Sequence, residues 1–299
     1  MRDVDWQLLA KHIRDWGKQL GFAEVGIVNA EKSEHQRYLT EWLAKGYHGN
    51  MAYMAKHDHL RSEPASLHPG TRSIICLRLD YFQRSTEPDR VLASDSKAYL
   101  SRYALGRDYH KVIRGKLKQL SRKISDHLIE RDYQGFDGRV FTDSAPLLEK
   151  AFAERAGLGW IGKNTLLLNE QAGSWFFLGE ILTNLPLPPS EKTKTNRCGS
   201  CSACMEACPT KAFKGPYQLD ARKCISYLTI EHKGSIDEPL RELMGNRIFG
   251  CDDCQDPCPF NRSASTKQPP PEAFAADARW EHDVESILHM SEEEFLEWG

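Results

Sequence analysis

The sequence predicts a mixed protein of the α/β (α+β) class joined to a small cysteine-rich module. Helical and strand-like apolar patterns alternate over residues 1–187, which is typical of helices layered on a sheet. A proline- and lysine-rich segment follows at 186–196 and marks a boundary. Residues 197–262 contain eight of the nine cysteines, and we expect residues 263–299 to form a flexible segment and a short C-terminal helix.

Apolar spacing predicts the individual elements of the first part. Leu9, Ile13 and Leu20 recur at helical spacing, and Gly21 is expected to cap that helix. Further helices are predicted at 33–45, 108–131 and 146–156. Strands are predicted at 23–28, 72–82, 138–142 and 172–184.

Length and composition restrict the class of protein. The 299 residues (34.1 kDa) have a formal net charge of −2 and can bury a substantial core. No apolar run approaches the roughly 20 residues that span a bilayer. The N-terminus MRDVDWQLLAKHIRDW has neither a signal-peptide core nor paired arginines. We therefore expect a cytoplasmic protein, in which cysteines indicate metal or redox chemistry rather than disulfides.

The cysteines form two runs with cluster-binding spacing. The first has the bacterial ferredoxin pattern C-x2-C-x2-C-x3-C-P, in which the fourth cysteine binds the neighbouring cluster. The second run lacks one cysteine of this pattern, and Cys224 can replace it. The predicted ligand sets are Cys198, Cys201, Cys204 and Cys258 for one 4Fe–4S cluster, and Cys208, Cys224, Cys251 and Cys254 for the other. Structural zinc is the alternative, but zinc ribbons do not require the crossed C-x3-C-P ends. Cys76 is expected to be a core residue of its strand.

Two further motifs do not predict the cofactor they suggest at first. Gly157, Gly159 and Gly162 match G-x-G-x-x-G, but they follow a helix instead of joining a strand to a helix. Nicotinamide or flavin binding is therefore not predicted there, and Gly157 is expected to be a helix C-cap. The segment beginning at Asp108 starts like a cobalamin-ligating D-x-H-x-x-G motif, but Ile113 occupies the glycine position. His110 is therefore not predicted to be an axial cobalt ligand.

Residues 97–123 carry a concentrated positive charge. This stretch has a net charge of +8, with only Asp108 acidic and with three tyrosines interleaved. Its basic residues are Lys97, Arg102, Arg107, Lys111, Arg114, Lys116, Lys118, Arg122 and Lys123, and its tyrosines are Tyr99, Tyr103 and Tyr109. A solvated helix face is one interpretation. The strength of the bias favours binding to a polyanion, with RNA the leading candidate.

Asp143 lies in the segment VFTDSAPLLEK, at the end of a predicted strand and before a helix expected to start at a proline. Ligands of open α/β sheets favour such an edge. An aspartate at this place can be a helix N-cap. It can also be a proton donor, which would require a poorly solvated pocket that raises its pKa.

Several segments together resemble the epoxyqueuosine reductase family, in order and up to about residue 262. These segments are YHGNMAYMAKHDHLR, SRYALGRDYHK, FTDSAPLLEK, GLGWIGKNTLLLN, the first cysteine run, CISYLTIE and MGNRIFGCDDCQDPCPFN. The resemblance implies a cobalamin-binding α/β domain, related to reductive dehalogenases, fused to a two-cluster ferredoxin-like module. It implies an oxidoreductase that converts epoxyqueuosine to queuosine at the wobble position of tRNA, the last step of queuosine synthesis.

The resemblance also implies partners and residue roles. The partners would be tRNAs for Tyr, His, Asn and Asp and an unidentified electron donor, and we expect a monomer that does not bind membranes. Asp143 would protonate the epoxide oxygen while the clusters supply electrons, one at a time, to cobalt. The candidate cobalamin contacts are Arg61, Ser226, Cys251 and Asp252, with the glycine loop 159–164 close to the corrin. His232 and the stretch 97–123 are candidate tRNA contacts.

Two other functions fit parts of the sequence. A cobalamin-dependent reductase of a small molecule, such as an organohalide, would share the cofactors, but such relatives are usually exported with a twin-arginine signal. A non-enzymatic electron carrier would not explain about 190 residues ahead of the cysteines. Many members of the family continue into a helical-repeat tail, whereas this sequence ends at Gly299. The full set of tRNA contacts is therefore not predicted from this sequence.

Overall fold

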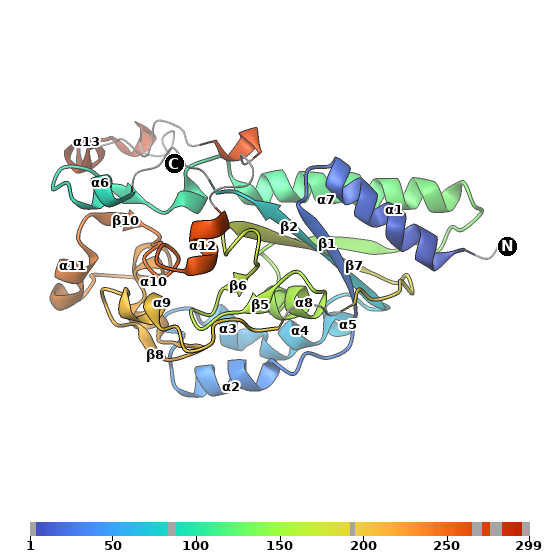
Figure 1. Cartoon of the computed structure of the whole chain (residues 1–299), viewed down its shortest axis with the longest axis horizontal. Helices are drawn as coiled ribbons and strands as arrows, with labels where there is room; N and C mark the ends of the chain where they lie inside the picture. Colours follow the sequence, from blue (N-terminus) through green and yellow to red (C-terminus); the bar gives the residue numbers. More distant parts are fainter. Residues whose placement is uncertain (1–3, 83–87, 192–194, 265–270, 276–282, 295–299) are drawn as a thin grey trace.

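A four-stranded antiparallel sheet forms the centre of the first part of the chain (Figure 1). The structure is a computed structural model, and it describes residues 4–82, 88–191, 195–264, 271–275 and 283–294. The strands are β1 (Glu24–Asn29), β2 (Ser73–Asp80), β4 (Gly138–Phe141) and β7 (Phe176–Thr183), in the order β1-β2-β7-β4. The two central strands, β2 and β7, pair over their full length, from Ser73 with Thr183 to Asp80 with Phe176.

Helices cover both faces of this sheet, as expected of a layered α+β fold (Figure 1). The helices α1 (Trp6–Gln19) and α7 (Tyr109–Ile129) pack on one face, and α8 (Glu149–Arg155) packs on the other. Because side chains alternate along a strand, Phe177 and Ile181 of β7 join the core under α1 and α7. The neighbouring residues Phe176 and Leu182 join the core under α8.

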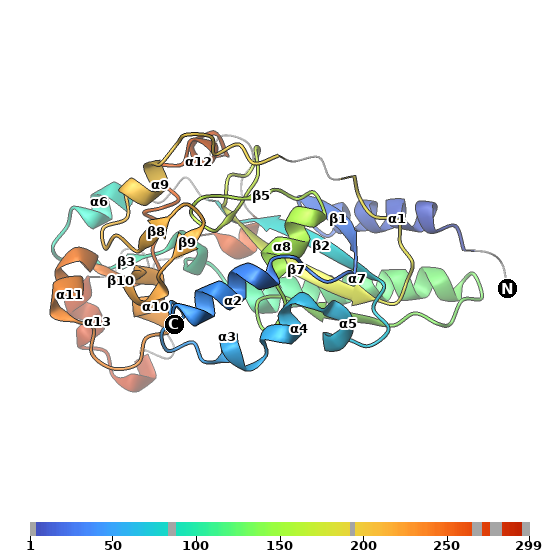
Figure 2. The ribbon, with the colours of Figure 1, turned by 90° about the horizontal axis from the view of Figure 1, so that it is seen from below.

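Short elements connect the sheet strands. Between β1 and β2 lie α2 (Gln36–Ala44), α3 (Tyr53–Lys56), α4 (Asp58–Ser62) and α5 (Pro64–Leu67), which Figure 2 shows along one side of the molecule. Between β2 and α7 lie α6 (Pro88–Leu92), β3 (Tyr99–Leu100) and the 3-10 helix η1 (Arg102–Ala104). A hairpin of β5 (Trp160–Ile161) and β6 (Leu167–Leu168) precedes β7.

The cysteine-rich part lies at the end of the molecule away from the N-terminus (Figure 1). Its elements are α9 (Ala203–Glu206), β8 (Phe213–Gly215), β9 (Gln218–Leu219), η2 (Ala221–Lys223), α10 (Ile225–Ile230), α11 (Glu238–Met244), β10 (Arg247–Phe249) and α12 (Pro259–Ala264). They are followed by η3 (Glu272–Phe274) and α13 (Val284–Leu288). Strand β10 pairs in parallel with β3, so main-chain hydrogen bonds join this part to the first part.

A fully buried carboxylate strengthens that junction. Asp252 accepts hydrogen bonds from Tyr99 Oη (2.9 Å), Ser101 Oγ (2.6 Å), the Arg102 amide (2.8 Å) and Gln255 Nε2 (3.1 Å). The Arg102 guanidinium lies 3.5 Å from the same carboxylate. A buried charge with this many donors is stabilised, whereas loss of its partners would leave it uncompensated.

The structure confirms most of the predicted elements. The strands and the long amphipathic helix occur as expected, with Ile113, Leu117, Leu120, Ile124 and Leu128 of α7 fully buried. The helix predicted at 146–156 instead begins at Glu149. Of the predicted flexible segment and C-terminal helix, residues 265–270, 276–282 and 295–299 lie outside the described residues, as do 192–194 of the predicted linker. None of the described helices is both long and apolar enough to cross a membrane.

Two glycines differ sharply in their surroundings. Gly26 lies on β1 against the end of α8, where a Cβ atom would overlap the Ala156 carbonyl oxygen. Gly115 lies on the exposed side of α7, where a Cβ would meet no atom within 4 Å. The first glycine is therefore required for the close approach of β1 and α8, and the second is not.

We predict opposite effects of Gly26→Ala and Gly115→Ala. The first should lower the free energy of unfolding by about 1–3 kcal/mol because of overpacking. The second should raise it by about 0.5–1 kcal/mol because alanine favours the helix. Urea denaturation of both variants measures this, and equal stability of the Gly26→Ala variant and the wild type would contradict the packing described for β1 and α8.

Candidate functional site

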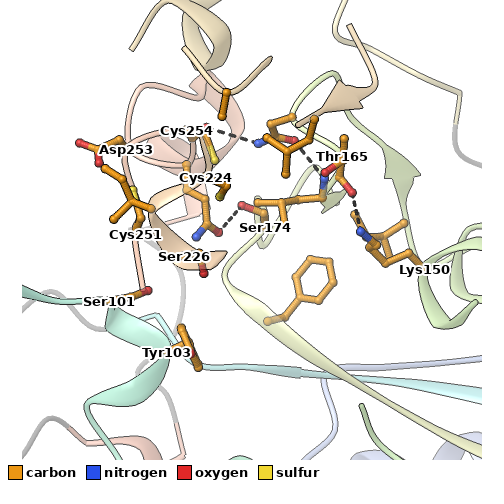
Figure 3. Close-up of a pocket in the computed structure, with 18 of the residues that line it drawn as sticks. Ser101, Tyr103, Lys150, Thr165, Ser174, Cys224, Ser226, Cys251, Asp253 and Cys254 are labelled. Carbon is orange, nitrogen blue, oxygen red and sulfur yellow. Dashed lines mark hydrogen bonds between the residues drawn. The ribbon is translucent and has the colours of Figure 1, made fainter. Parts of the chain in front are cut away.

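A cavity of about 530 Å³ lies between the sheet and the cysteine-rich part (Figure 3). Four cysteines line one side of it: Cys208, Cys224, Cys251 and Cys254. Asp143, Glu149 and Lys150, from the segment after β4 and the start of α8, also line it. Figure 3 shows Lys150 across the cavity from Cys224 and Cys251. The candidate acid and the second cysteine set therefore open onto one space.

A second cavity, of about 220 Å³, lies next to the first. It is lined by the other four cysteines of the module: Cys198, Cys201, Cys204 and Cys258. The structure thus brings the cysteines together in the same two groups of four that the spacing predicted, including the crossed members Cys208 and Cys258. Asn164 lines both cavities, so the two groups are neighbours.

All eight of these cysteines are free thiols in the structure, and each set of four lines one cavity. Burial, followed by the neighbouring Cys258, raises the pKa of the Cys204 thiol. Burial, followed by Cys224, raises the pKa of Cys254. Four thiolates so close together would repel one another without iron, and iron binding would release their protons. The chemistry of both groups therefore fits an iron–sulfur cluster, while the role of each cysteine as a ligand stays a prediction.

Asp143 lies on a turn between β4 and α8 and adopts a left-handed backbone conformation, with φ of +55°. Tyr109 Oη donates a 2.5 Å hydrogen bond to Asp143 Oδ2, and His110 Nε2 lies 3.4 Å from the same oxygen. The Tyr109 ring stacks on Phe177, with 4.3 Å between ring centroids. Burial, followed by the charge of Asp143, raises the pKa of Tyr109, so its hydroxyl remains a donor.

Three expectations about Asp143 are wrong. It is not a helix N-cap, because α8 begins six residues later at Glu149 and Leu148 occupies the capping position. Its side chain is also 63% exposed, not buried in a poorly solvated pocket. The sheet is antiparallel, so the rule for ligands of parallel sheets does not apply. The turn, rather than a helix start, directs Asp143 toward the cavity.

Sequence reasoning missed the two titratable residues that follow the turn. Glu149 Oε1 accepts a 2.7 Å hydrogen bond from the Asp143 amide. Burial, followed by the charge of Asp143, raises the pKa of Glu149 to about 7. Lys150 Nζ donates to the Thr165 carbonyl at 2.8 Å (Figure 3). The sequence signal that could have identified both is the adjacent acid and base, Glu149 and Lys150, six and seven residues after Asp143.

The four candidate cobalamin contacts are not placed alike. Ser226 and Cys251 line the large cavity. Arg61 does not line it, since its guanidinium is buried and donates to the Tyr53 carbonyl at 3.0 Å. Asp252 does not line it either, because its carboxylate accepts the donors described above. Direct contact of Arg61 and Asp252 with cobalamin stays a prediction that the lining of this cavity does not support.

The remaining lining of the cavity fits a corrin. Its polar groups include Thr165 and Ser226, which can hydrogen-bond the amide side chains of such a ring. Phe176 contributes an apolar wall. Of the loop 159–164, Asn164 reaches the cavity. His110 does not line it and contacts Asp108 and Asp143 instead.

The basic stretch is only partly available to a nucleic acid. Arg102 and Tyr99 are buried with Asp252, so their interpretation as RNA contacts is wrong. Lys97 pairs with Asp283 at 3.4 Å at the surface, and its contact with RNA stays a prediction. The exposed positive residues of α7 are Lys111, Arg114, Lys118, Arg122 and Lys123. His232 lies apart from them on the chain, after α10, with Nε2 3.1 Å from the Ser235 carbonyl.

Two family models match this chain. One described as "Epoxyqueuosine reductase QueG, DUF1730" matches residues 61–144. One described as "4Fe-4S double cluster binding domain" matches residues 197–261. The second match assigns two 4Fe–4S clusters to the cysteine-rich part and sets aside structural zinc.

Similar proteins cover most of the chain. The epoxyqueuosine reductase of Pseudomonas aeruginosa is 54% identical over 293 residues, which span 96% of this chain and 78% of that protein. An epoxyqueuosine reductase solved with an epoxyqueuosine-modified tRNA-Tyr stem loop matches with a TM-score of 0.84 and 29% identity, over 97% of this chain and 75% of that one. A Bacillus subtilis epoxyqueuosine reductase, solved with an aspartate catalytic loop swung out of the active site, matches with a TM-score of 0.83 and 29% identity, over the same shares.

A more distant match concerns the fold alone. A catabolic reductive dehalogenase, solved with 3-bromo-4-hydroxybenzoic acid, has a TM-score of 0.53 and 16% identity, over 89% of this chain and 34% of that one. This agrees with the predicted relation of the two folds. The Pseudomonas aeruginosa relative, in contrast, is 54% identical in sequence over 96% of this chain. The chain therefore belongs to the epoxyqueuosine reductase family.

Proposed function

We propose that this chain reduces the epoxide of epoxyqueuosine to the cyclopentene of queuosine at the wobble position of tRNA, in the last step of queuosine synthesis. The observation that carries the proposal is that Asp143 and the second cysteine set line the same cavity. The reaction removes the epoxide oxygen as water and consumes two electrons and two protons. It therefore needs an acid and a source of electrons on the same substrate.

Cobalamin is the proposed cofactor of this cavity. Bound there, it would supply low-valent cobalt chemistry at the epoxide carbon. Ser226 and Thr165 would hold its amide side chains by hydrogen bonds, and Cys251 would lie beside it. The cavity wall contributed by Cys224 and Cys254 would bring the second cluster next to it.

Asp143 would deliver a proton to the epoxide oxygen. After it gives up this proton, the carboxylate keeps the hydrogen bond from Tyr109, which stabilises the charge. His110, 3.4 Å away, would favour the same ionised state when it is protonated. A bound nucleoside would cover the exposed Asp143 side chain and exclude water from it.

The two clusters would carry electrons from the surface to the cavity. Cys201 of the first set is exposed, so an electron donor would dock beside that set. Asn164 lines both cavities and donates to the Cys254 carbonyl at 3.3 Å, which links the two sets. The division at 186–196, the monomeric state and the cytoplasmic location stay predictions.

The alternative is reduction of a small molecule such as an organohalide. Its support is the shared fold of a reductive dehalogenase. The exposed positive residues of α7 and the closer similarity to epoxyqueuosine reductases favour the tRNA substrate.

The Asp143→Asn variant should lose its activity. Asparagine keeps the size of the side chain but has no acidic proton, so we expect a decrease of about 10²-fold or more. The measurement uses protein loaded anaerobically with clusters and cobalamin, a strong reductant and epoxyqueuosine-containing tRNA, with nucleosides quantified by mass spectrometry. Asp132→Asn, an exposed aspartate with a φ of +60°, is the matched control and should leave the rate unchanged. A rate for Asp143→Asn within threefold of wild type would contradict the role of the acid.

The Cys224→Ser variant should lose one cluster and keep the other. We expect iron to fall from about eight to about four atoms per chain, because one set of four thiolates loses a member. Iron analysis and electron paramagnetic resonance (EPR) of the reduced protein measure this. Cys76→Ala, in the buried strand β2, is the control and should retain both clusters. Full iron content in Cys224→Ser would show that the assignment of this cysteine is wrong.

Reversing charge on α7 should weaken tRNA binding. For the double variant Arg114→Glu/Lys118→Glu, we expect lower affinity and a salt dependence (log K against log salt) shallower by about two, one for each lost phosphate contact. Filter binding at several salt concentrations gives this slope. Lys45→Glu, which follows α2, is the control. An unchanged slope in the double variant would place the tRNA on another surface.

A further inference from the structure

A glutamate lies in an otherwise apolar layer of the core. Glu180 is on the central strand β7 and is fully buried. Its cross-strand neighbours are Cys76 on β2 and Phe141 on β4, which both belong to the apolar cluster under α8. Burying a carboxylate in such surroundings is costly unless it is paired or protonated. The position therefore requires an explanation beyond packing.

The carboxyl of Glu180 has an unusual partner. Among the described residues, no conventional donor satisfies either of its oxygens. The group that faces it, within hydrogen-bonding reach, is the carboxyl of Glu149 at the start of α8. Two ionised carboxylates are both acceptors and repel each other, so a hydrogen bond between them requires a proton on one.

The carboxyl pair of Glu149 and Glu180 is connected directly to the turn that holds Asp143. Glu149 lines the large cavity and accepts the Asp143 amide at 2.7 Å. Asp143 has a left-handed backbone conformation, which costs energy for a residue other than glycine and persists only when its surroundings hold it. The Glu149 carboxylate is therefore placed to receive one hydrogen bond from the core and one from the turn.

We propose that Glu149 and Glu180 share a proton and act as positioning residues that hold the Asp143 turn in the cavity. Glu180 is the protonated member and donates to Glu149, whose carboxylate accepts the Asp143 amide. The positioning role rests on the proposed epoxide reduction, whereas the shared proton does not.

The surrounding charges agree with this assignment. Burial, followed by the charge of Glu149, raises the pKa of Glu180. With a pKa of about 7, Glu149 is ionised above that pH and protonated below it. The other titratable groups that face the pair, from the elements packed around it, are Asp143, Lys150, Arg61, Tyr109 and Cys76. Of these, Lys150 and Arg61 are cations that favour the ionised form of Glu149.

Infrared spectroscopy of the cluster-loaded protein tests the shared proton. We expect the carbonyl stretch of a buried, protonated carboxylic acid at pH 8, and a second such signal that grows as the pH falls through about 7. The pH 8 signal should be absent in Glu180→Gln, where an amide replaces the acid. It should remain in Glu130→Gln, the matched change at an exposed glutamate. A wild-type protein without this signal at pH 8 would overturn the proposal.

Kinetics tests the positioning role. Glu180→Leu keeps the bulk of the side chain but removes the donor, so we expect kcat to fall about tenfold or more because the acid is misplaced, with KM for tRNA unchanged. Glu180→Gln restores a donor to Glu149 and should recover most of the lost kcat. If Glu180→Leu does not fold, Glu149→Ala provides the same test from the partly exposed end of the pair.

The outcomes separate this inference from the proposed function. A wild-type kcat in Glu180→Leu, or equal losses in Glu180→Leu and Glu180→Gln, would overturn the positioning role. If the wild type forms no queuosine while the infrared signals are present, the proposed function fails and the positioning role fails with it, but the shared proton stands.

Discussion

The buried carboxylate of Asp252 is the interaction on which the geometry of the site depends. It belongs to the turn between Cys251 and Cys254, and three of its hydrogen-bond donors come from residues 99–102 of the first part of the chain. This contact, together with the pairing of β3 and β10, places the second cysteine set against the sheet. Without a fixed relation between the two parts, the cavity would have no defined wall on the cluster side, and electrons and protons could not be delivered to the same substrate atoms.

The opposite wall depends on how the chain leaves the sheet. Because β4 is an edge strand and α8 begins only at Glu149, the intervening residues form a turn that faces the cavity. The aromatic pair Tyr109 and Phe177 supports the turn from one side, and Glu149 supports it from the other. A rigid sheet and helix thus carry a short segment with a left-handed residue at the place of the proposed acid, Asp143.

The sequence was most informative where the structural signal is local. Cysteine spacing predicted both groups of four because a tight loop limits which thiols can meet, and apolar periodicity predicted the main strands and helices. The sequence was misleading for Tyr99 and Arg102. They belong to a positively charged stretch but are buried against Asp252, about 150 residues further along the chain. Glu180 gave no signal at all, since one polar residue in an apolar strand does not reveal which carboxyl faces it across the core.

The most direct test of whether cobalamin lies beside the second cluster is a measurement of the magnetic coupling between them. In protein loaded with cobalamin and both clusters and then partly reduced, pulsed EPR can detect the coupling between the unpaired spins of cobalt and of a reduced cluster. A cofactor in the cavity between Asp143 and the second cysteine set should couple to the second cluster, and removing that cluster should abolish the effect. Tightly bound cobalamin that shows no coupling to the second cluster would place the cofactor elsewhere and contradict the central claim.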